Sequence, residues 1–84
     1  MSRQAQTSLE KLRVRTRQRF AENLRTQRHR LKLTQERAAE KVGFSLQYVQ
    51  RIERAIVNVP LDTVSRFALA FDVDPAELLA KPCA

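Results

Sequence analysis

The sequence has few of the residues on which catalytic and metal-binding sites depend. It contains a single glycine, so a glycine-rich loop that cradles phosphate groups is excluded. Its one cysteine, Cys83, cannot form an internal disulfide. Its one histidine, His29, lies in an arginine-rich stretch with no cysteine and no cluster of carboxylates nearby. We therefore expect no catalytic residues, no metal and no cofactor, and the sequence does not predict an enzyme.

Long apolar runs and aromatic residues are also scarce. No stretch is long and apolar enough for a membrane span or a signal peptide, so we expect a cytoplasmic protein without a membrane partner. Phe and Tyr make up 6% of the residues and tryptophan is absent. The aromatic surface on which proteins stack single-stranded RNA is therefore not expected.

Positive charge is plentiful and unevenly distributed. The 16 basic and 9 acidic residues give a net charge of +7, which suits a polyanion but does not distinguish nucleic acid from other partners. Residues 1–19 hold six basic residues against Glu10 alone. We expect residues 1–15 to form a basic arm, residues 16–80 a single domain and residues 81–84 a loose end. The arm either binds DNA, along the phosphate backbone or in a minor groove, or is a solvated, partly disordered tail, and the sequence leaves these alternatives open.

The conformation of the arm is ambiguous. A capping box from Thr7 to Glu10 favours a helix, whereas arginines at alternate positions from Arg13 to Arg19 suit a strand. Helical spacing is kept by Leu9, Leu12, Thr16 and Phe20. We expect a helix from about residue 16, preceded by a frayed or adaptable segment, because a helix without a partner for its apolar face is weak.

Residues 34–53 form the most informative segment, since they predict two short amphipathic helices joined by a turn. Thr34 is a good N-cap for the first helix, whose apolar face holds Ala38, Ala39 and Val42. Gly43 ends this helix, because glycine adopts the left-handed conformation without a Cβ clash. We expect the two helices to approach most closely at Ala39.

The second helix of this segment has two contrasting faces. Ser45 caps it, and Val49, Ile52 and Ile56 are expected to face inward. The outward face holds Leu46, Gln47, Gln50, Arg51 and Arg54. This face has no acidic residue; its amides suit base edges and its guanidinium groups suit guanine or phosphate. The segment therefore predicts a helix-turn-helix, which places one helix in the DNA major groove.

Two further helices are expected after this segment. Pro60 suits the start of a helix over about 61–71, and Asp74 and Pro75 start a short final helix with Leu78 and Leu79 inside. The inner stripe of the first of these comprises Leu61, Val64, Phe67, Ala68 and Phe71. Apolar side chains also gather near Val57, Val59, Phe71 and Leu79, where they form either a subunit interface or simply core.

The motif LxLTQExxAExxGxSxxxVxxIE resembles the phage-repressor family, also called Cro-like or XRE-type. It is carried by Leu31, Leu33, Thr34, Gln35, Glu36, Ala39, Glu40, Gly43, Ser45, Val49, Ile52 and Glu53. The resemblance extends from about Phe20 to Leu79. It implies an all-α fold, a compact five-helix DNA-binding domain with the helix-turn-helix at about 34–54, and sequence-specific binding of double-stranded DNA as a homodimer.

The resemblance also implies roles for individual residues. Base reading would fall to Leu46, Gln47, Gln50 and Arg51, and phosphate binding to Gln35, Ser45, Tyr48 and Arg54. Gln35 would in addition brace the reading helix, and Arg28 would form a structural ion pair with Glu53. Three departures from the family pattern are Ala38, where a larger aliphatic residue is common, and Ala55 and Asp72, which stand where glycine is usual. The last two put a Cβ at left-handed positions.

These observations predict a transcriptional regulator that binds an inverted-repeat operator as a dimer. The alternative is a helix-turn-helix interaction module or antitoxin whose main partner is a protein, such as a toxin or RNA polymerase.

Overall fold

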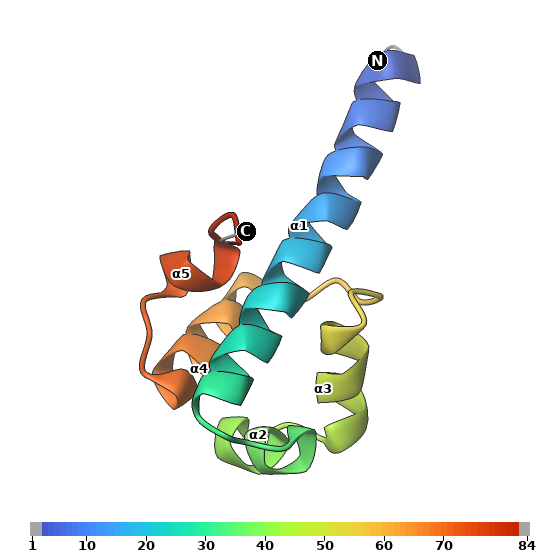
Figure 1. Cartoon of the computed structure of the whole chain (residues 1–84). Coiled ribbons are helices and arrows are strands. Elements are labelled where there is room, and N and C mark those ends of the chain that lie inside the picture. Colours follow the sequence, from blue (N-terminus) through green and yellow to red (C-terminus); the bar gives the residue numbers. More distant parts are fainter. Residues whose placement is uncertain (1–2, 83–84) are drawn as a thin grey trace.

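The computed structural model describes residues 3–82, and these form five helices and no strand (Figure 1). The helices are α1 (Arg3–Arg30), α2 (Gln35–Val42), α3 (Leu46–Glu53), α4 (Leu61–Phe71) and α5 (Pro75–Leu79). The predicted all-α, five-helix fold is confirmed. Over the described range, no helix combines the length and the apolar character needed to cross a bilayer. Cys83 and the end of the predicted loose C-terminus lie outside the described residues.

The helix α1 is much longer than the sequence indicated. Its C-terminal half packs into the domain through Phe20, Ala21 and Leu24, whereas its N-terminal half projects beyond all other helices (Figure 1). The prediction of a frayed segment before residue 16 is wrong, because the helix begins at Arg3 and passes straight through Thr7. Residues 3–16 contain no glycine or proline and many strong helix formers, so the helix propagates outward from its packed turns. We call residues 3–16 the overhang.

Phe67 of α4 lies at the centre of the hydrophobic core. Its ring contacts Phe20 of α1 at a centroid distance of 6.0 Å, Phe44 at 5.7 Å and Phe71 at 5.8 Å. These tilted and edge-on arrangements are the favourable ones for aromatic pairs. The other large, fully buried side chains are Leu24, Leu78 and Val49. One core therefore joins the helices and fixes the inner side of α3.

Two predictions about inward-facing residues are wrong. Ile56 is 61% exposed, because α3 ends at Glu53 and the left-handed residue Ala55 turns the chain away. Leu61 is 76% exposed, because it is the first residue of α4 and no other element covers that end. Phe71 is fully buried, as predicted for the inner stripe of this helix, so of the two alternatives for the apolar side chains near it, core applies to Phe71.

Three residues adopt the left-handed backbone conformation that the sequence predicted for them. Gly43 has φ 85°, Ala55 has φ 62° and Asp72 has φ 56°. The predictions for Ala55 and Asp72 are thus confirmed, while Lys32, with φ 57°, carried no recognised signal. Alanine in this region brings its Cβ too close to the following carbonyl oxygen, whereas the short polar side chain of aspartate is tolerated there.

We expect Ala55→Gly to stabilise the protein by up to about 1 kcal/mol, because it relieves this contact. Part of the gain is offset because glycine loses more backbone entropy on folding. Urea unfolding of the variant and the parent measures the difference. Asp72→Gly is the matched control and should give a smaller gain. An Ala55→Gly variant less stable than the parent would show that residue 55 is not strained.

Candidate nucleic-acid interface

The helix-turn-helix is built from local capping interactions. The Thr34 side chain accepts a hydrogen bond from the amide of Arg37 at 3.1 Å, which starts α2. The amide of Gly43 donates to the carbonyl of Ala39 at 2.9 Å, which closes the last turn of α2. The Ser45 side chain then accepts from the amide of Tyr48 at 3.1 Å, which starts α3. The caps predicted from the sequence are therefore present.

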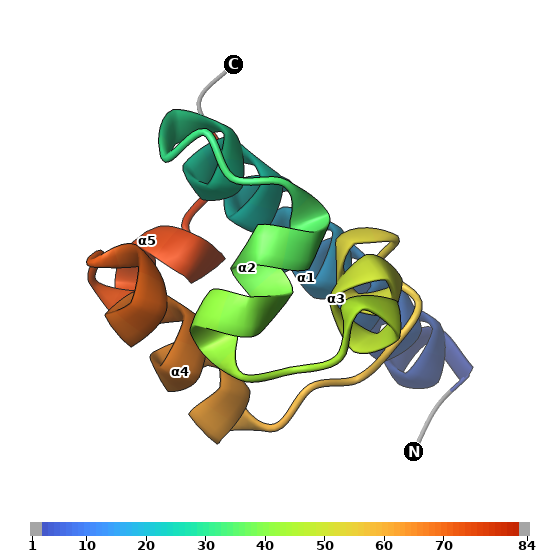
Figure 2. The same ribbon diagram turned by 90° about the horizontal axis from the view of Figure 1, so that it is seen from below.

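The two helices cross at a steep angle over this short turn (Figures 1 and 2). Ala39 is buried in α2, and Val49 and Ile52 form the buried face of α3. A methyl side chain at Ala39 leaves room for the close approach of the two helices that a short turn requires. The opposite face of α3 is thereby directed away from the core.

The predicted base-reading residues share this outer face of α3. Leu46, Gln47 and Arg51 are exposed, and Gln50 is half-buried. Gln47 and Arg51 are four residues apart and so lie one turn from each other on the same side of the helix. The only acidic residue of α3 is Glu53, which is buried on the other side. The outer face therefore presents amide and guanidinium groups without a competing carboxylate.

The predicted phosphate-binding residues lie at the ends of the two helices. Gln35 is the first residue of α2, Ser45 is the N-cap of α3, and Tyr48 is in the first turn of α3. Tyr48 is half-buried and its ring meets Phe44 edge-on at 5.0 Å. Arg54 is exposed at the C-cap of α3. Ser45 and Tyr48 lie together at the start of α3, whereas the Gln35 side chain contacts Glu53 at the end of that helix. Each of the two helix N-termini carries partial positive charge.

Glu53 is the point at which α3 is attached to the rest of the protein. Its carboxylate forms a two-point ion pair with Arg28 of α1, with Oε2 2.8 Å from Nε and Oε1 3.0 Å from Nη2. The side-chain amide of Gln35 donates to Oε1 at 3.2 Å. Arg28 also donates to the carbonyl of Leu33 at 3.0 Å, which fixes the loop before α2. The expected Arg28–Glu53 pair therefore ties together three segments.

Arg25 is a further attachment that sequence reasoning missed. Its guanidinium donates to the main-chain carbonyl of Glu53, one of the carbonyls at the end of α3 that has no partner within the helix. Arg25 lies three residues before Arg28 in α1, so both arginines reach the same end of α3. That spacing was the only signal in the sequence, because every residue has a backbone carbonyl and the sequence does not show which one accepts a hydrogen bond.

Arg66 of α4 holds the turn between α2 and α3 and was also missed. Its Nε donates to the carbonyl of Val42 at 3.0 Å, and its guanidinium lies 4.9 Å from the centre of the Phe44 ring, a cation–π distance. A Cβ added to Gly43 would come within 3.0 Å of the Arg66 Nη2. Glycine at position 43 thus satisfies both the left-handed conformation and the space taken by Arg66.

A family model described as a helix-turn-helix domain matches residues 19–80. The chain belongs to the phage-repressor-like, XRE-type helix-turn-helix family. No curated protein sequence matches it significantly. Within residues 8–82, the inner side of α3 carries the contacts that hold this helix-turn-helix in place, and its outer side is left to solvent. The family match begins at Arg19, so the overhang lies outside it.

Solved structures of transcription factors are similar to this one. The hypothetical transcription factor NHTF from Neisseria is 31% identical, with a TM-score of 0.78 over 80% of this chain and 77% of that one. The restriction-modification controller protein C.AhdI from Aeromonas hydrophila is 35% identical, with a TM-score of 0.70 over 74% of this chain and 94% of that one. An HTH_3 family transcriptional regulator from Vibrio cholerae, 20% identical, matches in fold with a TM-score of 0.74 over 79% of this chain and 37% of that one. Family and neighbours together support a DNA-binding regulator.

Proposed function

We propose that this helix-turn-helix protein is a transcriptional regulator that binds double-stranded DNA sequence-specifically, as a dimer on an inverted-repeat operator. The observation that carries the proposal is the outer face of α3, where Gln47 and Arg51 face solvent beside the half-buried Gln50, while Glu53 anchors the opposite side of the helix. A helix held in this way enters the major groove as a rigid body.

The chemistry of the outer face matches base edges. A glutamine amide forms two hydrogen bonds with adenine N6 and N7, and an arginine guanidinium forms two with guanine O6 and N7. Leu46 supplies an apolar contact of the kind that recognises a thymine methyl group. Gln35, Ser45 and Tyr48 would meet phosphates at the N-terminal ends of α2 and α3, and Arg54 would meet one at the other end of α3.

The size of the domain and its surface support the proposed dimer. A domain of roughly 65 residues buries only about 60% of the surface of its unfolded chain, so association adds needed stability. Val57, Val59 and Leu79 are half-buried at the edge of the core and Leu61 is exposed. A two-fold axis would place the two α3 helices in successive major grooves, about 34 Å apart, on an inverted repeat.

The experiment that tests the proposal is a selection of bound fragments from random duplex DNA, followed by titration of the protein with the selected site. Gln47→Ala and Arg51→Ala should each relax the preference at one base position per half-site by about 1 to 3 kcal/mol. Arg54→Ala is the matched control: it should weaken operator and random duplex by nearly the same factor and reduce the salt slope by about one per contact.

Two outcomes would contradict the proposal. If Arg54→Ala changed the base preference and Gln47→Ala and Arg51→Ala did not, the base-reading residues would lie on a different side of α3. Equal affinity for every duplex, together with tight binding of a protein, would assign the chain to the class of protein-interaction modules.

A further inference from the structure

The overhang carries an apolar stripe that nothing in the described structure covers. At 100° per residue, Leu9, Leu12 and Thr16 lie on the same side of α1 as the buried residues Phe20 and Leu24. The core-facing side of α1 therefore continues for more than two turns past the domain. Leu12 is 55% exposed, and every described side chain from Ser8 to Thr16 faces solvent.

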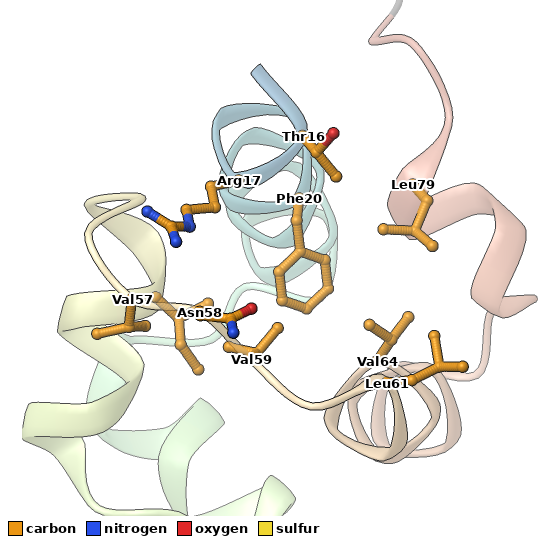
Figure 3. A pocket seen from close by; sticks show the side chains of 10 residues that line it. Thr16, Arg17, Phe20, Val57, Asn58, Val59, Leu61, Val64 and Leu79 are labelled. Carbon is orange, nitrogen blue, oxygen red and sulfur yellow. The ribbon is translucent and has the colours of Figure 1, made fainter. Parts of the chain in front are cut away.

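An open apolar groove lies at the base of this stripe. It has a volume of about 240 Å³ and runs between α1, the linker after α3, and the helices α4 and α5 (Figure 3). Its apolar walls are formed chiefly by Phe20, Val57, Val59, Leu61 and Leu79. Thr16 lies at its rim, where the stripe meets the groove (Figure 3).

The stripe and the groove of one molecule cannot cover each other. The helix α1 is continuous, so Leu9 lies about 10 Å beyond Thr16 along its axis, pointing away from the domain. A second copy related by a two-fold axis near Thr16 would run its α1 antiparallel to the first. Leu12 of each copy then lies over the groove of the other, which makes the same patch complementary to itself, as a two-fold interface requires.

The net charges of the overhang and of the segment that holds α4 and α5 are opposite. The overhang holds four basic residues and Glu10, a net charge of +3. Residues 61–79, which include α4 and α5, hold four acidic residues and Arg66, a net charge of −3. Asp62 is exposed and follows Leu61, which lines the groove, while the charged residue in the groove lining itself is Arg17. A basic overhang that crosses the groove toward α4 and α5 would therefore meet the acidic side chains of these helices beyond the groove, although the whole chain is basic.

We propose that the overhang is a dimerisation arm whose apolar stripe packs into the groove of a second copy of this chain. The inference rests on the proposed function, which requires a dimer, and it specifies the surface by which the dimer forms. Packing on a second copy also gives the overhang the partner that an isolated helix needs for stability.

Sedimentation of the full chain with a substitution in the stripe tests the proposal. We expect Leu12→Ala to weaken the dimer at least about tenfold, since the two-fold axis makes each substitution act twice. Val14→Ala is the matched control, because Val14 is 50% exposed on the opposite side of the same helix. It should dimerise like the parent. Alanine is the better helix former in both cases, so neither variant melts the overhang.

A crosslinking experiment tests the position of the axis. In a Cys83→Ser background, Thr16→Cys should form a disulfide between two copies on mild oxidation, whereas Gln18→Cys, on the opposite side of α1, should not.

The outcomes separate this proposal from the proposed function. The dimerisation arm is overturned if Leu12→Ala dimerises like the parent, or if Thr16→Cys crosslinks no better than Gln18→Cys. The proposed regulator still stands in that case if the parent binds its selected operator as a dimer. A parent that is monomeric both free and on its operator overturns both. Unchanged dimerisation together with Leu12-dependent binding to phosphatidylserine vesicles would also overturn the arm and assign the stripe to an anionic membrane.

Discussion

Arg28→Leu will lower the free energy of unfolding by about 3 to 5 kcal/mol, because it leaves the Glu53 carboxylate buried without a charged partner. Glu53 is 6% exposed, and the side-chain amide of Gln35 is its only other side-chain donor among residues 8–82. A neutral amide at 3.2 Å does not compensate for the loss of a two-point ion pair. Urea unfolding monitored by circular dichroism measures the loss, which is a large part of the stability of a domain this small.

Two further variants separate burial from charge. Arg37→Leu removes the arginine of an ion pair with Glu40 that is 3.9 Å long and exposed, and should cost less than about 1 kcal/mol. The double variant Arg28→Leu/Glu53→Leu should recover much of the loss, because both buried charges are then absent. Equal destabilisation by Arg28→Leu and Arg37→Leu would mean that the Glu53 site is open to water.

Ala39→Leu will abolish DNA binding and destabilise the protein by about 1 to 3 kcal/mol. Ala39 is buried on the inner face of α2, so a larger side chain has no room there. We expect it to force α2 and α3 apart and to move the outer face of α3. Thermal unfolding and an operator titration measure the two effects. Glu40→Leu is the matched control, since it puts the same side chain on the exposed face of α2 and should leave both properties near those of the parent. An Ala39→Leu variant that melts like the parent would show that position 39 is not the crossing point.

The helix-turn-helix could be predicted from the sequence because its signals are local. Thr34, Gly43 and Ser45 each act on residues a turn away, and the periodicity of Val49 and Ile52 marks the inner face of the same short helix. The ion pair of Arg28 with Glu53 came from the family resemblance. Arg25 and Arg66 escaped notice because both donate to backbone carbonyls far away in the chain, and every residue type provides such a carbonyl.

The periodicity of apolar residues did not predict which turns of a helix are covered by the rest of the domain. Leu61 and Phe67 follow one helical pattern, but only Phe67 reaches the core. Leu61 is the first residue of α4 and stays exposed, although Thr63 and Val64 just after it are buried. The start of α1 was misjudged for a related reason. Leu9 and Leu12 have no partner within the domain, which disfavours a helix. The helix nevertheless continues outward from the packed turn at Phe20, because no helix breaker interrupts the run of helix formers.

Because α3 is anchored through its inner side, the residues that would select a DNA site differ from those that hold the fold together. Gln47, Gln50 and Arg51 form no side-chain hydrogen bond within residues 8–82, whereas the contacts of Glu53, Val49 and Ile52 are all directed inward. The exposed Gln47 and Arg51 can therefore be exchanged with little loss of structural contact, and an exchange of the half-buried Gln50 breaks no side-chain hydrogen bond within this range. On such a scaffold a duplicated copy could acquire a new operator by a few substitutions, and evolution or an engineer could retarget the protein while every residue that shapes the domain stays the same.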